Sequence, residues 1–420
     1  MHTPDGELPA APTLFLALAP ATWGEARAGL ALAQQRHART GDVLFVAPSS
    51  LSALFYNAQV PYRLFPVGAS LPRVLADVHA RFQPRQLILV DAMATLLNSQ
   101  ACGCTWSQLI GRAARVAALD LWDLDAAGDS WDLGSVLVPV PQEARALPRV
   151  CPAPLGAPDR ATSYAALPEA PPVSTSAAPT RSDLGLAAET RVVLFATSTW
   201  QDPDLFPPAP GTRAIAFGLR SRVAAWLKAW PNVVLLHAAP APWGDLAASL
   251  GPRYRFVGQL PPARMQRLLA IADVLLSANA ASTLLADALV QRLPVLLLQS
   301  TAAGCSIEQV AASVSWPLVP QMRDWIATVL PLRPFCVWPV GLSAFLRGVV
   351  HGNPLYRGLA TVELTDDERV RDTLAELLFG NRLRAQLTQS MAELESRYRA
   401  LPDGDALLAK ALGETPTRSS

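Results

Sequence analysis

The sequence has little charge, few cysteines and no long apolar run, and each shortage excludes a class of protein. Charged residues make up only 16% of the 420 residues and the formal net charge is +1, so no basic surface favours nucleic acid or an anionic membrane. No apolar run approaches the roughly 18 residues that a membrane-spanning helix needs. The five scattered cysteines favour a reducing compartment. We therefore expect a cytoplasmic protein without an integral membrane segment and without a nucleic-acid partner.

Several motifs that define common enzyme classes are also missing. The sequence contains no G-x-S-x-G, no Walker A and no G-x-G-x-x-G motif. Serine hydrolase, P-loop NTPase and dinucleotide-binding functions therefore have no support. The thiols of Cys102 and Cys104 are not followed by a second Cys or His pair at zinc spacing, so we expect no metal site.

Short apolar segments alternate with amphipathic ones in two regions of the chain. Apolar residues make up 51% of the sequence, and its length suffices for two domains with separate cores. The alternation in residues 1–150 and 191–363 indicates βαβ units and parallel sheets. Residues 151–190 are rich in Pro, Ala and Ser and predict a linker. Residues 364–420 predict a mostly helical segment that closes across the domains, with a break near Gly380.

The expected elements follow these apolar segments. In the first region we expect strands at 13–18, 43–47, 87–90, 116–121 and 136–140 and helices at 25–39, 71–81 and 105–115. In the second region we expect strands at 192–196, 233–237, 254–257, 274–277 and 295–298 and helices at 220–230, 264–271 and directly after 281. Thr365 is the expected N-cap of the C-terminal helical segment.

Residues 271–298 form one unit: an apolar strand, a turn of small residues, an amphipathic helix and a second apolar strand. The helix opens on Ser282 and Thr283, and a helix N-terminus offers backbone N–H groups and a positive dipole end to a phosphate. N-capping is the alternative role of these two hydroxyls. Asp287 lies one turn into the helix, where a carboxylate would accept ribose hydroxyls; a solvated or capped carboxylate is the alternative. Asn279 stands in the turn, where a close approach to a pyrophosphate normally requires glycine.

Residues 256–298 resemble the donor half of UDP-sugar transferases, including the enzyme that completes lipid II and the macrolide and plant transferases. Their V-G-x-L-P loop is matched by Val257-Gly258-Gln259-Leu260-Pro261. Their E-A-L-x-x-G-x-P helix is matched by Asp287-Ala288-Leu289 and Pro294, with Asp in place of Glu and Arg292 in the glycine position. The resemblance implies a GT-B fold, in which two Rossmann-like parallel-sheet domains face each other across a cleft. The donor-binding candidates are Thr197, Ser198 and Thr199, which replace a Gly-Gly-Ser loop, and Gly258, Gln259, Leu260, Asn279, Ser282, Thr283 and Asp287.

The segment that opens the first expected helix carries the catalytic candidate. Its run Trp23-Gly24-Glu25-Ala26-Arg27-Ala28 resembles the S-x-G-E-x-R-A-A segment of the Kdo transferases, which use the acid as general base. The resemblance therefore implies that Glu25 is the base and that Gly24 and Arg27 lie on the acceptor side. A first-turn acid that complements the helix dipole is the alternative reading of Glu25. Asp91 follows an expected strand and Asp120 lies at the carboxyl end of another, where they would line an acceptor pocket or cap the next helices.

These resemblances imply a metal-independent glycosyltransferase of the GT-B type. It would transfer a sugar from a nucleotide-activated donor to a small-molecule or peptide acceptor and would need no cofactor. The missing glycines leave a second reading open, a catalytically inactive GT-B-like protein that serves as a binding or partner subunit. A protein partner or a homo-oligomer is compatible with either reading, as is use of the cleft for another small molecule.

Overall fold

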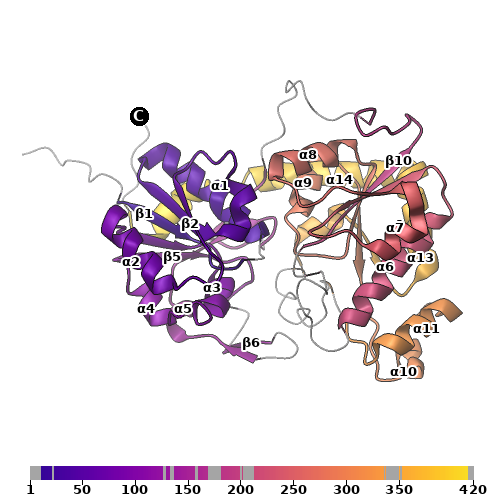
Figure 1. The fold of residues 1–420 in the computed structure, drawn as a ribbon, viewed down its shortest axis with the longest axis horizontal. Helices are drawn as coiled ribbons and strands as arrows, with labels where there is room; N and C mark the ends of the chain where they lie inside the picture. The colour runs from indigo at the N-terminus through magenta and orange to yellow at the C-terminus, as the bar shows by residue number, and fades with distance from the viewer. Residues whose placement is uncertain are drawn as a thin grey trace, which may run out of the picture. The chain divides into compact units, whose positions relative to one another are not determined.

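The computed structural model describes residues 11–20, 23–125, 129–132, 137–156, 159–168, 181–198, 201, 212–334, 336, 350 and 352–414. The chain forms two compact units (Figure 1). Unit 1 combines the residues up to 131 with 138–166 and the residues from 398 onward. Unit 2 consists of residues 132–137 and 167–397. Thr199 lies outside the described residues.

Unit 1 is built on a seven-stranded parallel sheet in the order β3-β2-β1-β4-β5-β8-β9. Its strands are β1 (Thr13–Leu16), β2 (Val43–Pro48), β3 (Tyr62–Phe65), β4 (Gln86–Leu89), β5 (Arg115–Leu119), β8 (Arg149–Ala153) and β9 (Ser163–Ala165). Its helices are α1 (Trp23–Thr40), η1 (Ser49–Phe55), α2 (Leu71–Phe82), α3 (Ala92–Ser99), α4 (Trp106–Ile110), α5 (Gln142–Arg145) and α15 (Gly404–Ala411). The short strands β6 (Ser130–Asp132) and β7 (Leu137–Pro139) pair with each other in a separate sheet.

Unit 2 is built on a six-stranded parallel sheet in the order β12-β11-β10-β13-β14-β15. Its strands are β10 (Arg191–Ala196), β11 (Val233–Ala238), β12 (Tyr254–Phe256), β13 (Val274–Ser277), β14 (Val295–Gln299) and β15 (Ala360–Glu363). Its helices are α6 (Thr212–Lys228), α7 (Gly244–Leu250), η3 (Gly251–Arg253), α8 (Pro262–Ile271), α9 (Leu284–Gln291), α10 (Ile307–Ala312), α11 (Pro320–Val329), η4 (Pro354–Gly358), α13 (Asp367–Phe379) and α14 (Arg382–Arg399).

The two sheets share one topology, which confirms the predicted α/β class with two Rossmann-like sheets. In each unit, six adjacent strands of the sheet have the order 3-2-1-4-5-6 when they are numbered by their succession along the chain. This order is the doubly wound arrangement of nucleotide-binding folds. The strand order reverses between β1 and β4 in unit 1, and between β10 and β13 in unit 2. Ligands of such sheets bind at this switch point, beyond the carboxyl ends of the strands.

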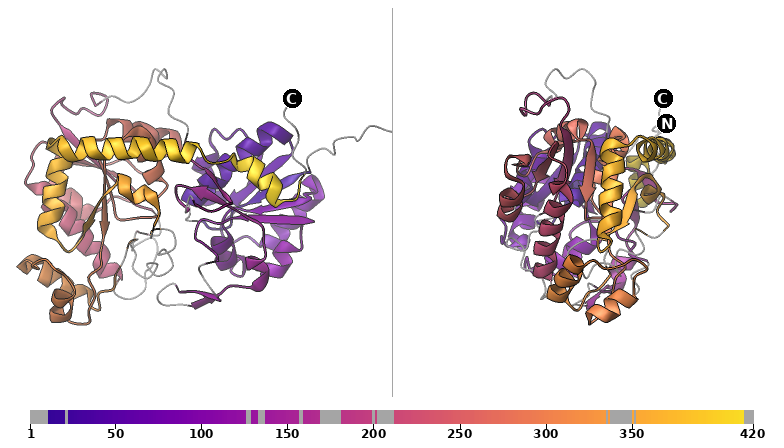
Figure 2. Two further views of the ribbon diagram at one scale, coloured as in Figure 1. Left: turned by 180° about the vertical axis from the view of Figure 1, so that it is seen from behind. Right: turned by 90° about the vertical axis from the view of Figure 1, so that its right-hand side faces the viewer.

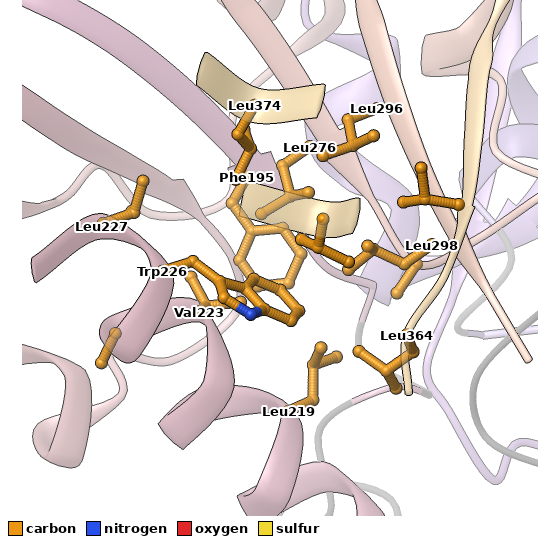
Figure 3. Close-up of a cluster of buried hydrophobic side chains, with 14 of the residues drawn as sticks. Phe195, Leu219, Val223, Trp226, Leu227, Leu276, Leu296, Leu298, Leu364 and Leu374 are labelled. Carbon is orange, nitrogen blue, oxygen red and sulfur yellow. The ribbon is translucent and has the colours of Figure 1, made fainter. Parts of the chain in front are cut away.

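The core of unit 2 shows why its segments fold as they do (Figure 3). In α6, Leu219, Val223, Trp226 and Leu227 recur at helical spacing and are almost completely buried. They pack with Phe195 of β10 and with leucines of the neighbouring strands β13 and β14. Continuous apolar strands are typical of a parallel sheet that helices cover on both faces.

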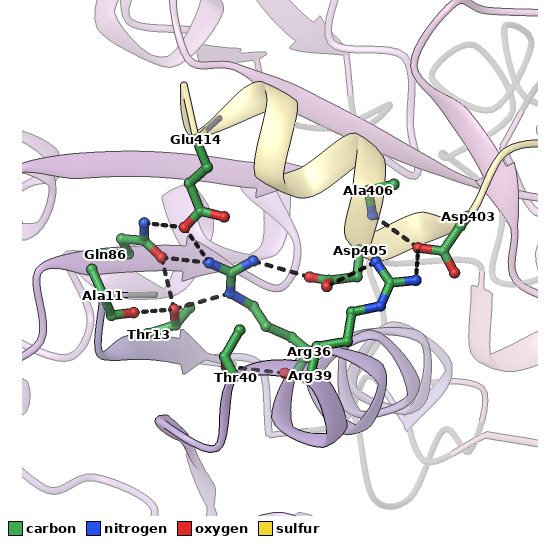
Figure 4. Close-up of polar contacts among 10 residues, drawn as sticks. All are labelled: Ala11, Thr13, Arg36, Arg39, Thr40, Gln86, Asp403, Asp405, Ala406 and Glu414. Atoms are coloured by element: carbon green, nitrogen blue, oxygen red, sulfur yellow. Dashed lines mark hydrogen bonds and ion pairs between the residues drawn. The ribbon is translucent and has the colours of Figure 1, made fainter. Parts of the chain in front are cut away.

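A buried arginine fixes the C-terminal helix α15 to unit 1 (Figure 4). Figure 2 shows α15 (yellow) over the strands of this unit, and it contacts α1, β8 and β9. The Arg36 guanidinium forms ion pairs with Asp405 (3.0 Å) and Glu414 (2.5 Å) and donates hydrogen bonds to Gln86 (2.8 Å) and Thr13 (3.0 Å). The chain therefore returns to its first domain at the end.

Domain boundaries and some elements differ from those predicted. Strand β8 overlaps the start of the expected linker 151–190, and β9 lies within it. Both strands extend the first sheet. The helix expected at 105–115 ends at Ile110, because Arg115 already begins β5. The strand expected at 136–140 is β7, outside the main sheet.

The C-terminal helices follow the prediction more closely. Gly380 does separate two helices, α13 and α14, and ends the first of them. The N-cap of α13 is Asp366 instead of Thr365, and its carboxylate accepts the Arg369 N–H. None of the helices that the structure describes is long and apolar enough to span a membrane.

Candidate functional site

The switch point of unit 1 is shaped by a close contact between α1 and the end of β4. A Cβ atom at Gly29 would lie only 2.5 Å from Val90 Cγ1, so α1 can approach the strand this closely only with glycine there. Glu25 lies one helical turn before Gly29 and therefore on the same face of α1. Because Asp91 directly follows Val90, the contact brings the Glu25 and Asp91 carboxyl groups to the same place.

Asp91 is held firmly at this position. Its side chain is 4% exposed, and one carboxylate oxygen accepts the Ala94 N–H at 2.9 Å as the N-cap of α3. The other oxygen accepts the Trp122 indole N–H at 2.7 Å. Burial raises the pKa of Asp91 to about 6, although the hydrogen bonds from Ala94 and Trp122 oppose this rise. The capping role that the sequence left open is therefore present.

Glu25 occupies the first turn of α1 and is half-buried. Burial, and next the negative charge of Asp91, raise the pKa of Glu25 to about 8, while its own backbone N–H opposes the rise. A carboxyl group with this pKa takes up and releases a proton near neutral pH, as a general base must. Gly24 and Arg27 lie half-buried in the same turns of α1, and Arg27 has interaction partners of its own.

Asp120 belongs to a network of structural interactions beside these two acids. Its carboxylate accepts the backbone N–H groups of Trp122 (3.3 Å) and Leu124 (3.1 Å). It also forms an ion pair with Arg160 at 3.1 Å, and Arg160 binds Asp123 at 2.5 Å as well. Burial raises the pKa of Asp120, and the Arg160 charge counteracts this. Asp120 is thus engaged with the protein, and Arg160 and Trp122 are site residues that the sequence reasoning missed.

The switch point of unit 2 carries hydroxyl groups in the loop after β10. Thr197 is 7% exposed, its backbone N–H donates to Ala238 at 2.9 Å, and its hydroxyl lies 3.3 Å from His237 Nε2. The Ser198 N–H donates to the Gln201 side chain at 3.0 Å. These hydrogen bonds hold Thr197 and Ser198, the first two residues after β10.

The turn after β13 is closed by internal hydrogen bonds. Asn279 accepts the Ala281 N–H through its side chain at 2.9 Å, and the Cys336 carbonyl accepts the Ala280 N–H at 3.1 Å. These bonds use backbone donors that a glycine turn would direct at a phosphate. In this turn the side-chain hydroxyl groups, more than the backbone, are the groups available to an anion.

Helix α9 begins at Leu284, one residue after Thr283. The Ser282 hydroxyl accepts the N–H of Leu284, the first residue of the helix, at 3.3 Å. The N-cap residue is Thr283, and its side chain makes no capping hydrogen bond. Both residues are half-buried at the N-terminus of α9, beside the switch point.

The loop that follows β12 lies at the same edge of the sheet. The Val257 N–H donates to the His237 carbonyl at 3.0 Å, which ties the loop to β11. Gly258 has a φ of +74°, a conformation that side-chain-bearing residues rarely adopt. Gln259 is exposed and Leu260 is half-buried. The glycine of the V-G-x-L-P pattern is thus required by the backbone.

Asp287 lies one turn into α9, where its backbone N–H donates to the Thr283 carbonyl at 3.3 Å. Its side chain is completely buried, and one carboxylate oxygen accepts a hydrogen bond from Gln266 of α8. Gln266 in turn accepts a hydrogen bond from Gln291. A ribose would reach Asp287 only after displacing Gln266, so the structure favours a role for this acid in packing α9 against α8. Within the described residues, no group of three or more His, Cys, Asp or Glu side chains is placed to hold a metal ion.

Solved structures with the same architecture place the chain in a fold class. Spinosyn rhamnosyltransferase SpnG, solved with spinosyn aglycone, is 17% identical with a TM-score of 0.53, over 95% of this chain and 99% of that one. Spinosyn forosaminyltransferase SpnP is 14% identical with a TM-score of 0.51, over 96% of this chain and 100% of that one. MnaA of S. aureus, solved with UDP, is 11% identical with a TM-score of 0.53, over 97% of this chain and 99% of that one. The protein has the GT-B fold.

The sequence also places the chain in a protein family. It belongs to a family of unknown function (DUF6365), whose model matches residues 32–415. No curated protein shows significant sequence similarity to the chain. The matched range includes Asp91, Thr197 and Asp287, whereas Glu25 precedes it.

Proposed function

We propose that the protein is a glycosyltransferase that moves a sugar from a nucleoside diphosphate sugar to a hydroxyl group of a small-molecule or peptide acceptor. The observation that carries this proposal is the acid at the switch point of unit 1. Glu25 has its pKa raised to about 8, next to a second carboxyl group that Trp122 and α3 hold in place. Among the solved structures with this fold, SpnG has been determined with thymidine diphosphate and with its aglycone.

Unit 2 is proposed to bind the nucleotide diphosphate. Thr197 and Ser198 after β10, and Ser282 and Thr283 at the start of α9, present hydroxyl groups at the carboxyl ends of β10 and β13. The positive end of α9 adds a favourable field for the developing charge on the leaving diphosphate. The Gly258 loop at the neighbouring strand end is proposed to accommodate the base.

Unit 1 is proposed to supply the base. Ionised Glu25 would take the proton of the acceptor hydroxyl while the acceptor oxygen forms a bond to the anomeric carbon. The bond from that carbon to the phosphate oxygen breaks at the same time, and its electron pair leaves with the nucleoside diphosphate. We propose that the field at the start of α9 takes the place of a metal ion, so that EDTA leaves the rate unchanged.

A thermal-shift panel with UDP, GDP, TDP and CMP tests the donor site. A nucleotide present at 100 times its Kd stabilises the native state by about 2.7 kcal/mol, which raises the melting temperature by several degrees. If no nucleotide or nucleotide sugar shifts the transition, the donor assignment is refuted.

The nucleotide that binds then allows turnover to be tested. Hydrolysis or transfer of its sugar is followed by release of the nucleoside diphosphate, with Glu25→Gln as the catalytic variant. We expect this variant to bind the nucleotide as the wild type does and to release no product. Nucleotide binding without turnover by the wild-type protein would instead support the alternative of an inactive GT-B-like binding subunit.

A further inference from the structure

A row of hydrogen bonds runs behind the β10 loop of unit 2. His237, near the end of β11, is completely buried. Its Nε2 lies 3.3 Å from the Thr197 hydroxyl, and its Nδ1 lies 2.8 Å from the Tyr254 hydroxyl. The backbone N–H of Trp243 donates to that same Tyr254 oxygen at 2.8 Å. Hydrogen bonds thus connect four groups, which come from four segments of unit 2, one to the next.

The direction of these bonds follows from the number of protons available. Burial raises the pKa of Tyr254, so the phenol keeps its proton. Trp243 N–H takes one lone pair of the Tyr254 oxygen, and the phenol proton needs an acceptor of its own. In the part of unit 2 that the structure describes, His237 Nδ1 is the acceptor within hydrogen-bond distance. Nδ1 is then unprotonated.

This direction determines the state of the imidazole and of the threonine. An imidazole whose Nδ1 accepts a hydrogen bond is uncharged and carries its proton on Nε2. Nε2–H therefore donates to the Thr197 oxygen. The single proton of the Thr197 hydroxyl is left to be donated onward, from the carboxyl end of β10.

The surroundings of the ring keep it in this orientation. The imidazole stacks on Phe195 at a centroid distance of 5.7 Å and lies 4.4 Å from the Trp243 ring. These ring contacts, together with a hydrogen-bond partner at each nitrogen, restrict the rotation that would exchange the two nitrogens. The hydroxyl of Thr197 is thus supplied with a fixed donor before any ligand arrives.

We propose that His237, oriented by Tyr254, is a positioning residue that commits the Thr197 hydroxyl to donate a hydrogen bond to a phosphate oxygen of the bound diphosphate. This inference rests on the proposed function and adds the means by which a loop without glycines binds the anion. The ligand chemistry is that of a pyrophosphate group, free or within a nucleoside diphosphate.

Two measurements test the proposal, and the first needs no ligand. The protein has five histidines, so ¹⁵N-histidine labelling gives few signals, and His237→Gln identifies the one from His237. We expect the neutral Nε2–H form of His237 at pH 7.5 in the wild type, and a mixture of the two neutral forms in Tyr254→Phe. A protonated Nδ1 in the wild type overturns the relay, whether or not nucleotides bind.

The second measurement is calorimetric titration with inorganic pyrophosphate, UDP and uridine. Thr197→Val keeps the shape of the side chain and should weaken pyrophosphate and UDP binding roughly 10- to 100-fold, because a hydrogen bond to a charged group is lost. Uridine affinity should be unchanged. Thr197→Ser retains the hydroxyl and should stay within about threefold of the wild type.

The outcomes separate the relay from the proposed function. If wild-type protein binds UDP and Thr197→Val binds it equally well, the relay is refuted while the transferase proposal stands. If neither pyrophosphate nor UDP binds to the wild type, both are refuted, although the histidine spectrum still reports the hydrogen-bond direction. Should Tyr254→Phe fail to fold, the matched Thr197 variants still give the answer.

Discussion

Glu25→Gln should stabilise unit 1 at alkaline pH, although removing an acid from the first turn of a helix normally destabilises it. Burial raises the pKa of Glu25 from 4.5 to about 8 in the folded protein, whereas the unfolded chain ionises it at the ordinary value. Between these values the folded state binds more protons than the unfolded state. The free energy of unfolding therefore falls as the pH rises from about 4.5 to 8 and is level above that.

The size of the effect follows from the same shift. Each pKa unit corresponds to about 1.4 kcal/mol, so the rise from 4.5 to about 8 sets an upper limit of about 5 kcal/mol. Because the Glu25 side chain is only half-buried, we reduce this to about 2–3 kcal/mol. A unit of this size melts roughly 2–4 °C higher per kcal/mol. Glu25→Gln should thus melt about 4–12 °C above the wild type at pH 9, and at the same temperature as the wild type at pH 4.

Calorimetric melting between pH 4 and pH 9 measures this difference. Glu308→Gln is the matched control, since Glu308 also lies in the first turn of a helix. A hydrogen bond from Ser306 lowers the pKa of Glu308, so its ionised form stabilises the fold. The control should melt below the wild type at pH 9 and lose this difference as the pH falls. If Glu25→Gln behaves like the control, or differs from the wild type equally at every pH, Glu25 is an ordinary helix-dipole residue.

Substitutions at three further positions test the packing within the two units. Arg36→Ala leaves buried carboxylates without their cation and should cost about 3–5 kcal/mol in urea unfolding; a loss below 1 kcal/mol would contradict this role. Gly29→Ala forces a Cβ atom against Val90 and should lower the free energy of unfolding by about 1–3 kcal/mol. The double variant with Val90→Ala should recover most of this loss. If it recovers none, Gly29 does not owe its role to the contact with Val90. Asp287→Ala should lower the free energy of unfolding by about 1–3 kcal/mol, and Asp287→Asn should lower it less. Both variants should keep the nucleotide affinity of the wild type. If the Asn variant folds but binds nucleotide more weakly, Asp287 has the ribose role after all.

The sequence predicted most of the strands that are apolar runs and missed several that are not, although β12, with Arg255 at its centre, was predicted as well. Strands such as β10 and β13 are continuous apolar runs, because helices cover both faces of the sheet. Strand β3 is a half-exposed edge strand, and β8 contains Pro152, which argues against a strand on sequence grounds. These segments become strands because a neighbouring strand offers a partner, and that partner is distant in the sequence.

The candidate site was predictable residue by residue but not as an arrangement. Glu25 and Asp91 were both identified from local patterns, yet their proximity depends on the contact between Gly29 and Val90. The hydrogen bond from the Trp122 indole to Asp91 was missed, because the sequence around a tryptophan in a loop does not indicate which acceptor the indole will contact. Asp287 had the right spacing for a ribose ligand, and only the packing of α8 shows that Gln266 occupies it.

The replacement of glycines by hydroxyl residues in unit 2 has a physical explanation that preserves phosphate binding. Glycine brings the backbone close to a phosphate, so that main-chain N–H groups act as donors. In the turn after β13 these donors are already used by Asn279 and Cys336, so the side chains must reach the anion instead. A free hydroxyl is a weak substitute, because it rotates and accepts as readily as it donates. The buried imidazole behind Thr197 reduces that freedom, since its Nε2–H takes one lone pair of the oxygen and directs the hydroxyl proton away from the ring. We therefore propose that a loop of this kind needs a fixed imidazole, here His237, where a glycine loop needs none.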